Sequence, residues 1–192
     1  VALVESDDIG TIGVGEATIP HINHVLAVIG IDEKEFMRRV DGTFKQSIRY
    51  VNWTHNKGDY YHHPFSRYRP GPIDRTAAAW LRSDRSIPFT ETVSAQPIVC
   101  ELGLSAQMLG PWDLGPPLTY AFHMNALKFA DYLSELATSR GVTHHRDHVV
   151  DVKVTENGHI ESLTTKAGLR LQADLFIDCS GFAALLIESN WA

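Results

Sequence analysis

The sequence has few cysteines, no long apolar run and no cluster of basic residues, and each absence excludes a class of protein. Its two cysteines, Cys100 and Cys179, are too few and too far apart for a disulfide framework or a zinc-ligand motif, so we expect free thiols and a cytoplasmic location. No apolar run approaches the roughly 20 residues that a membrane-spanning helix needs, so no membrane partner is expected. Seventeen Lys and Arg stand against 23 Asp and Glu, which argues against nucleic acid as a partner.

Metal binding is also disfavoured, although the chain has 10 histidines. Some of them are adjacent, as at His62-His63 and His144-His145, with His148 nearby. Adjacent residues on a strand point to opposite faces and cannot hold one ion. No Cys or carboxylate lies at ligand spacing, so we predict no metal site.

The chain is rich enough in apolar residues to build a core. Of its 192 residues, 44% are hydrophobic and 21% are charged, which is the composition of an ordinary globular domain. It opens directly on an apolar run, VALVES, and ends at Trp191-Ala192. We therefore expect an internal piece of a longer protein.

Hydrophobic periodicity predicts four elements in the first third of the chain. They are a strand over 1–5, a helix capped by Thr18 with Pro20 in its first turn and Gly30 at its end, a helix with an Asp32/Glu35 capping box, and one alternating strand over 43–54. Residues 55–75 have no apolar period and are rich in Pro, Gly and aromatic residues. This stretch is expected to be a long excursion over the surface or over a site.

The rest of the chain predicts helices followed by strands. The expected elements are short helices over 76–82 and 94–104, a helix over 125–140 closed by Gly141, and a β-meander over 142–155, 159–165 and 169–173 with turns at Asn157-Gly158 and Ala167-Gly168. A last apolar strand, 174–182, runs into Gly181, and such strand ends often border a ligand crevice in α/β sheets.

Two places have features of a nucleotide site. Glu5 ends the first strand, where a carboxylate can accept hydrogen bonds from ribose hydroxyls, although a solvated strand end is the more common reason for such a residue. In the loop GTIGVGEATIP, Gly13 and Gly15 permit close approach of a ring or phosphate to the main chain. Glu16 fits equally well as a partner of a flavin edge or an ion, or as an acid favoured by the dipole of the following helix.

Three motifs, VGEATIP, TFKQSIRYVNW and DLFIDCSGF, resemble the tryptophan halogenase family of flavin-dependent halogenases, in order along the whole chain. The resemblance implies an α/β fold, the glutathione-reductase-like (Rossmann-type) FAD-binding fold of flavin monooxygenases, with a β-meander and helical substrate-side insertions. It implies that residues 1–20 and 125–192 belong to the FAD-binding module and 21–124 mainly to the substrate side. A GxGxxG turn before residue 1 and the C-terminal half would lie outside this chain, which alone should be inactive.

The resemblance also implies roles for individual residues. Lys45 matches the catalytic lysine of the family, and Glu5 resembles its ribose ligand. The remaining matches are the strap beside the FAD (Thr11, Ile12, Gly13, Val14, Gly15, Glu16 and Ala17), the adenine contact (Val149), the strand end near the dinucleotide (Asp178, Ser180 and Gly181) and a loosely matching substrate wall (Trp80, Ile87, Pro88 and Phe89).

The implied activity is an oxidoreductase reaction of secondary metabolism. FADH2 from a separate flavin reductase, oxygen, and chloride or bromide would give hypohalous acid, which halogenates tryptophan or another indole or aromatic through Lys45. A homodimer is kept as a candidate assembly. Two alternatives stay open: an FAD-dependent aromatic hydroxylase (monooxygenase) of the same fold, and a non-catalytic FAD-binding module.

Overall fold

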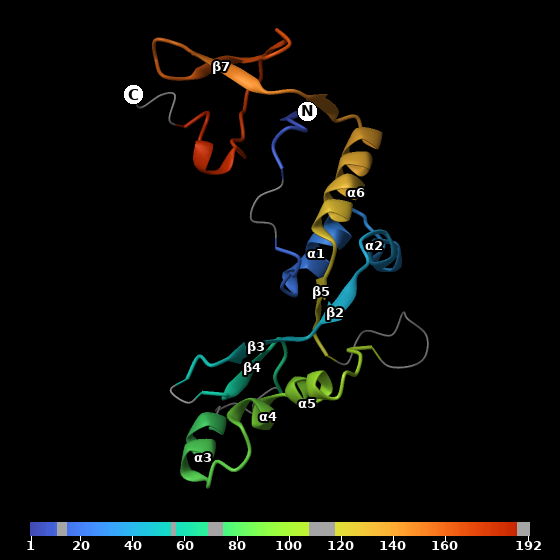
Figure 1. Ribbon diagram of the computed structural model, residues 1–192, viewed down its shortest axis with the longest axis vertical. Helices are drawn as coiled ribbons and strands as arrows, with labels where there is room; N and C mark the ends of the chain where they lie inside the picture. Colours follow the sequence, from blue (N-terminus) through green and yellow to red (C-terminus); the bar gives the residue numbers. More distant parts are fainter. Residues whose placement is uncertain (11–14, 55–56, 69–74, 108–117, 188–192) are drawn as a thin grey trace. The chain divides into compact units, whose positions relative to one another are not determined.

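The structure is a computed structural model that describes residues 1–10, 15–54, 57–68, 75–107 and 118–187. The chain forms two compact units (Figure 1). Unit 1 consists of Val1–Ile12 and Leu133–Ala192, and unit 2 of Gly13–Tyr132. No helix in the described part of the chain is long and apolar enough to cross a membrane.

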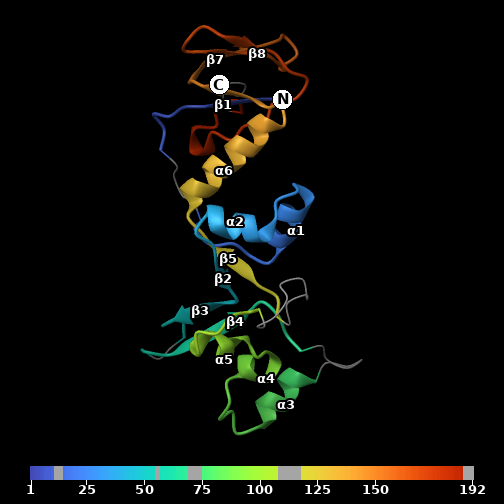
Figure 2. The ribbon, with the colours of Figure 1, turned by 90° about the vertical axis from the view of Figure 1, so that its right-hand side faces the viewer.

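Unit 2 alternates short strands with short helices. Its elements are α1 (His21–Val28), α2 (Glu33–Arg39), β2 (Thr43–Lys45), β3 (Ser47–Val51), β4 (Tyr60–Pro64), α3 (Thr76–Arg82), α4 (Phe89–Val93), α5 (Gln96–Glu101), β5 (Ala121–His123) and the start of α6 (Ala126–Ser139), which continues into unit 1. Both ladders of this unit are antiparallel, β2 with β5 and β3 with β4. Figure 2 shows α4 and α5 lying beside the β3–β4 hairpin.

An aromatic cluster under the β2–β5 ladder forms the core of unit 2. Phe36 of α2 and Phe122 of β5 are fully buried, with ring centroids 5.0 Å apart. Phe129 of α6 meets the Phe36 ring edge-on at 5.3 Å. Tyr120 packs edge-on against Phe44 at 4.8 Å and donates its hydroxyl to the Glu33 carboxylate. This packing fixes the short ladder that carries Lys45 at its end.

Unit 1 combines a parallel pair of strands with an antiparallel meander. The pair is β1 (Ala2–Glu5) with β6 (Thr143–Arg146), and the meander is β7 (Val149–Val154), β8 (Ile160–Thr165) and β9 (Arg170–Leu171), followed by the short 3₁₀ helix η1 (Gly181–Ala183). Gly158 and Gly168, at the two meander turns, have φ values of 80° and 86°, a region open to glycine at no steric cost. The predicted hairpin turns are thus confirmed.

Several predicted elements are confirmed as well. Asp32 caps α2 by accepting a hydrogen bond from the Glu35 amide at 2.9 Å. The strand over 1–5 and the helices over 76–82 and 125–140 match β1, α3 and α6. Gly30 and Gly141, with positive φ, follow α1 and α6 as expected.

Other predictions were wrong, for physical reasons. Thr18 does not cap α1, because its hydroxyl bonds to Phe122 instead. The strand over 43–54 breaks at the buried Gln46, since β2 and β3 pair with different partners. Residues 55–75 contain β4, whose tyrosines suit a strand despite the lack of an apolar period. The predicted meander strand over 142–155 divides, because β6 leaves the meander to pair with β1.

The last predicted strand is also absent from the described part of the chain. Residues 174–180 are described but pair with no strand there, and Leu175 and Ile177 are each 76% exposed. A strand needs a hydrogen-bonding neighbour, and this stretch has none in the described residues. Other missed elements are α4, which is a single turn, and β5, which has only three residues.

Candidate active site

Lys45 is the last residue of β2, and the β2–β5 ladder determines where it points. Lys45 pairs with Ala121, and Thr43 pairs with His123. Directly opposed residues, and those two positions along, share one face of an antiparallel ladder. Lys45 and His123 therefore project from the same face.

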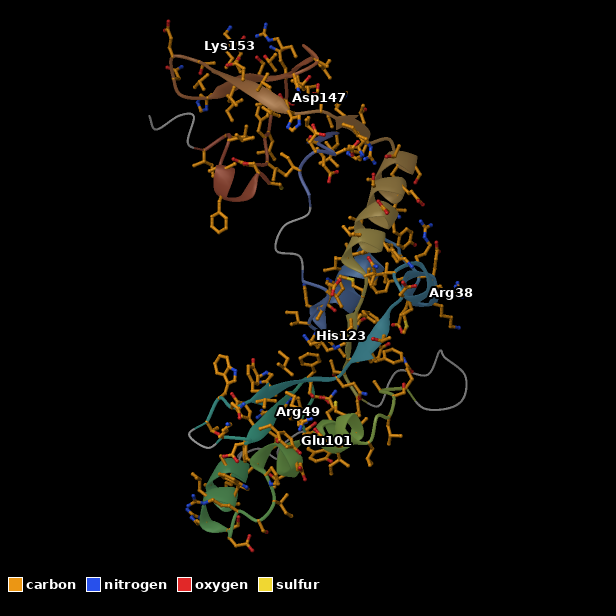
Figure 3. The ribbon with its side chains drawn as sticks, in the orientation of Figure 1. Arg38, Arg49, Glu101, His123, Asp147 and Lys153 are labelled. Atoms are coloured by element: carbon orange, nitrogen blue, oxygen red, sulfur yellow. The ribbon has the colours of Figure 1, made fainter. Side chains whose placement is uncertain are left out.

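That face opens onto a cavity of about 530 Å³ in unit 2. Its walls come from β2, β3, β4, β5 and the end of α5: Phe44, Lys45, Gln46, Ser47, Arg49, His62, Cys100, Glu101, Gly103, Leu104 and His123. Figure 3 labels Arg49, Glu101 and His123 of this set. The volume lies within the range of small-molecule sites, so the cavity is large enough to receive an aromatic ring.

Two contacts hold the Lys45 ammonium. Its Nζ donates a hydrogen bond to the main-chain oxygen of Thr18 at 3.1 Å, and lies 5.5 Å from the centroid of the Phe65 ring. In the same cavity, partial burial, with a smaller contribution from the Lys45 charge, lowers the pKa of His123. At neutral pH His123 is therefore an uncharged neighbour of the lysine.

The chain from Glu16 to Thr18 is bonded to β5 next to Lys45. The Glu16 carbonyl accepts from the Met124 amide at 2.9 Å, and Ala17 forms a bridge with His123. The Thr18 amide donates to the Phe122 carbonyl at 2.9 Å. Glu16 and Ala17, the last residues of the predicted strap, thus lead directly to the Thr18 carbonyl that holds the lysine.

Four residues of the predicted strap, Thr11, Ile12, Gly13 and Val14, lie outside the described residues. Gly15 is described, and among the described residues a side-chain carbon placed on it would meet only the Ala17 carbonyl oxygen, at 3.5 Å.

A hydrogen-bonded cluster of Ser47, His62 and Glu101 on the cavity wall was missed by sequence reasoning. Ser47 Oγ lies 2.7 Å from His62 Nδ1, and His62 Nε2 lies 2.8 Å from Glu101 Oε1. The hydrogen bond from His62, with the nearby charge of Arg49, lowers the pKa of Glu101. His62 had been considered only as a metal ligand, and the signal that was overlooked is a serine two residues after Lys45.

The predicted substrate wall forms a cluster elsewhere in unit 2. Trp80 Nε1 donates to the Ile87 carbonyl at 2.8 Å, and its ring meets Phe89 edge-on at 5.6 Å. Pro88 lies between these residues and precedes α4. The structure brings the four residues together, but they are not among the residues that line the Lys45 cavity.

In unit 1, Glu5 lies at the end of β1, with its side chain 60% exposed. Its main-chain oxygen accepts from the Asp147 amide at 3.0 Å, and its Oε2 is 3.1 Å from His144 Nε2. The carboxylate is thus accessible to hydroxyl donors. Val149, the predicted adenine contact, begins β7 and pairs with Thr165.

Asp178 and Ser180 are occupied by local hydrogen bonds. Asp178 Oδ1 accepts from the amide and the hydroxyl of Ser180, at 2.9 and 2.6 Å, and Oδ2 accepts from the Leu186 amide at 2.9 Å. These bonds, led by the Ser180 hydroxyl, lower the pKa of Asp178. Gly181 follows with a φ of 64° and begins η1. These hydrogen bonds hold a turn, and glycine at position 181 adopts the positive φ of that turn without backbone strain.

Within the described ranges, no three His, Cys, Asp or Glu side chains lie where they could share a metal ion.

Comparison with known proteins places these features in a family. Residues 1–191 match the sequence profile of the tryptophan halogenase family. The chain is 33% identical to a 7-chloro-L-tryptophan 6-halogenase of Kutzneria, over 98% of this chain and 40% of that protein. It is 34% identical to a tryptophan 7-halogenase of Lentzea aerocolonigenes, over 98% of this chain and 38% of that protein.

Solved structures agree with the sequence relatives. A tryptophan halogenase from Shewanella frigidimarina superposes with a TM-score of 0.87 and 38% identity, over 99% of this chain and 37% of that one. A tryptophan C-6 flavin-dependent halogenase from taromycin biosynthesis gives a TM-score of 0.88 and 35% identity, over 99% and 39%. The predicted α/β, FAD-binding fold class is confirmed. The chain spans about two fifths of the length of these relatives, and it belongs to the tryptophan halogenase family.

Proposed function

We propose that the full-length protein is a flavin-dependent halogenase that acts on tryptophan or another indole or electron-rich aromatic. The observation that carries the proposal is the position of Lys45, which lines a cavity of ring size with its ammonium anchored. Membership of the family supports the same activity, since the relatives are named tryptophan halogenases.

The role proposed for Lys45 follows from its chemistry. An ammonium is a compact charged donor, and it can hydrogen-bond hypohalous acid and polarise it for electrophilic transfer to a carbon atom. The Thr18 carbonyl restrains the end of this flexible side chain. Restraint matters because a catalytic group held in the reactive geometry avoids the entropy cost of finding it.

The residues present are compatible with FAD, which would supply the oxidation of halide by oxygen. Glu5 is proposed as the acceptor for the ribose hydroxyls, because its carboxylate is exposed at a strand end. The lack of a side chain at Gly15 suits a ring lying close to the main chain of the proposed strap, which comprises Thr11 to Ala17. Val149 stays a proposed contact of the dinucleotide. So does the turn formed by Asp178, Ser180 and Gly181, which we propose to bind through its main-chain groups, because both carboxylate oxygens of Asp178 already accept hydrogen bonds.

The experiment uses the full-length protein with FAD, a separate flavin reductase, NADH, chloride or bromide, and a panel of indoles that includes tryptophan. We expect halogenated product by mass spectrometry. Lys45→Ala should abolish halogenation while flavin reoxidation continues. Lys128→Ala is the matched control, because Lys128 pairs with Asp41 at the surface of unit 2 and should leave product formation close to wild type.

The result also separates the alternatives. Hydroxylated product from the wild type would identify an aromatic hydroxylase and contradict the proposal. Undiminished halogenation by Lys45→Ala would contradict the role given to the lysine. Flavin binding with no reaction would favour a non-catalytic FAD-binding module.

A further inference from the structure

When the His62 imidazole is neutral, the Ser47–His62–Glu101 cluster has one direction of hydrogen bonding. An ionised carboxylate only accepts, so His62 Nε2 carries the proton that bonds Glu101 Oε1 at 2.8 Å. In the neutral imidazole Nδ1 is then an acceptor, and it receives the Ser47 hydroxyl proton across 2.7 Å. His62 is only 5% exposed, which holds the ring in this arrangement.

This direction leaves Ser47 Oγ as an acceptor on the cavity wall. Because its proton is given to His62, the contact with Cys100 Sγ at 3.3 Å places the thiol as the donor. A hydroxyl oxygen has two lone pairs, so one remains for a ligand. Ser47 and Lys45 line the same cavity, from β3 and β2, which are consecutive in the sequence.

Gln46, the neighbour of Ser47 in the chain, also carries an acceptor, but this one is buried. Gln46 is 6% exposed, and its Nε2 donates to the Leu104 carbonyl at 2.8 Å, which fixes the orientation of the amide. Its Oε1 is buried with no hydrogen-bond partner among the described residues. Because this oxygen is closed off from the cavity, Ser47 Oγ is the acceptor beside it that a ligand can reach.

We propose that Ser47 is a specificity-determining residue whose Oγ accepts a hydrogen bond from the ring N–H or O–H of an electron-rich aromatic substrate, such as an indole. The inference rests on the proposed function for the identity of the substrate. The hydrogen bond to Ser47 Oγ makes the site bind rings that carry an N–H or O–H donor more tightly than rings of the same shape without one.

The cluster also affects the reaction itself. As the carbon–halogen bond forms, the halogen–oxygen bond of hypohalous acid breaks, and its oxygen takes up a proton and leaves as water. The ring carries positive charge until its C–H proton passes to water, and during this time a ring N–H is a stronger donor. Glu101 supplies a negative charge behind His62 and Ser47, so the hydrogen bond strengthens as that charge develops. An interaction that is stronger in the transition state than in the ground state raises kcat.

The test is a binding cycle with the full-length protein, indole, and benzofuran, which has the same shape with oxygen in place of N–H. Isothermal titration should show that Ser47→Ala weakens indole about fivefold, as expected for one lost hydrogen bond, and benzofuran less than twofold. Ser66→Ala is the control, since Ser66 follows β4 but does not line the cavity. Thermal unfolding checks that each variant is folded.

Glu101→Gln tests the charge with little change in packing, because the amide oxygen can still accept from His62. It should lower kcat for indole halogenation about five- to tenfold, and leave indole binding and benzofuran turnover within twofold of wild type. Equal weakening of both ligands by Ser47→Ala, no weakening of either, or no indole binding to the wild type would overturn the proposal. If indole binds as described but is not halogenated, the proposed function fails while the assignment of Ser47 stands.

Discussion

Lys45 and Thr18 are joined by a hydrogen bond of 3.1 Å from the lysine Nζ to the threonine main-chain oxygen. The threonine is itself fixed to β5, because its hydroxyl accepts from the Phe122 amide at 2.9 Å and donates to the Phe122 carbonyl at 3.2 Å. Phe122 is fully buried. Lys45, the candidate catalytic residue, is therefore held by the Thr18 carbonyl, and the core of unit 2 fixes the position of that carbonyl.

Thr18→Val should weaken the hydrogen bond between Lys45 and the Thr18 carbonyl while leaving the lysine itself unchanged. Valine has nearly the same shape, but it leaves the buried Phe122 amide without a partner, at a cost of about 1–3 kcal/mol. We expect the free energy of unfolding to fall by this amount, and kcat for halogenation to fall about tenfold, which corresponds to about 1.4 kcal/mol of lost transition-state stabilisation. The KM for the aromatic substrate should change little. Steady-state kinetics of the full-length protein measure both constants.

Thr18→Ser provides the control for that variant. It keeps the hydroxyl, and both its stability and its kcat should stay close to those of wild type. An equal loss in Thr18→Ser and Thr18→Val would show that the hydroxyl does not position the carbonyl.

Gly42, just before β2, has no room for a side chain. A β-carbon at this position would lie 3.0 Å from the Met37 Cα and 3.3 Å from its Cγ, and the closer of the two atoms belongs to the backbone of α2. Gly42→Ala should therefore lower the free energy of unfolding by about 1–3 kcal/mol, as overpacking does. Gly10→Ala is the matched control, because a β-carbon there meets no atom of the described residues within 4 Å. Chemical denaturation of the two variants would contradict the prediction if their midpoints were equal.

The sequence predicts long or strongly marked elements well and the cavity poorly. The capping box of Asp32 and the glycine turns of the meander are local signals, in which the residues that determine the conformation are close in sequence. The break at Gln46 is not local, since β2 and β3 separate only because their partners, β5 and β4, lie elsewhere in the chain. Lys45 was found through a motif, and no periodicity in its own strand could have shown which cavity it lines.

The Ser47–His62–Glu101 cluster illustrates the same limit. Its members come from β3, β4 and α5, and 15 residues separate the first two and 39 the last two. Their meeting depends on the β3–β4 register, which pairs Ser47 with Pro64 and Arg49 with His62. The stretch that carries His62 lacked an apolar period, so neither the strand nor its register was predicted.

The stability of unit 1 should depend on Asp147 in acid. Hydrogen bonds from the Thr165 side chain and then the Ala167 amide lower the pKa of Asp147 from its ordinary value of 3.8. A carboxyl group whose pKa is lower in the folded state binds protons more readily when unfolded, so it stabilises the fold at pH values above about 4, and this contribution is lost as the pH falls through the folded pKa. Asp147→Asn removes the stabilisation that the ionised Asp147 carboxylate gives. The free energy of unfolding of the variant should be lower than that of wild type at pH 6, and the difference between the two proteins should shrink as the pH falls below 4. Thermal unfolding between pH 3 and 6, followed by circular dichroism, measures this slope. A wild-type slope in Asp147→Asn would show that the turn between β6 and β7 gains nothing from the ionised carboxylate.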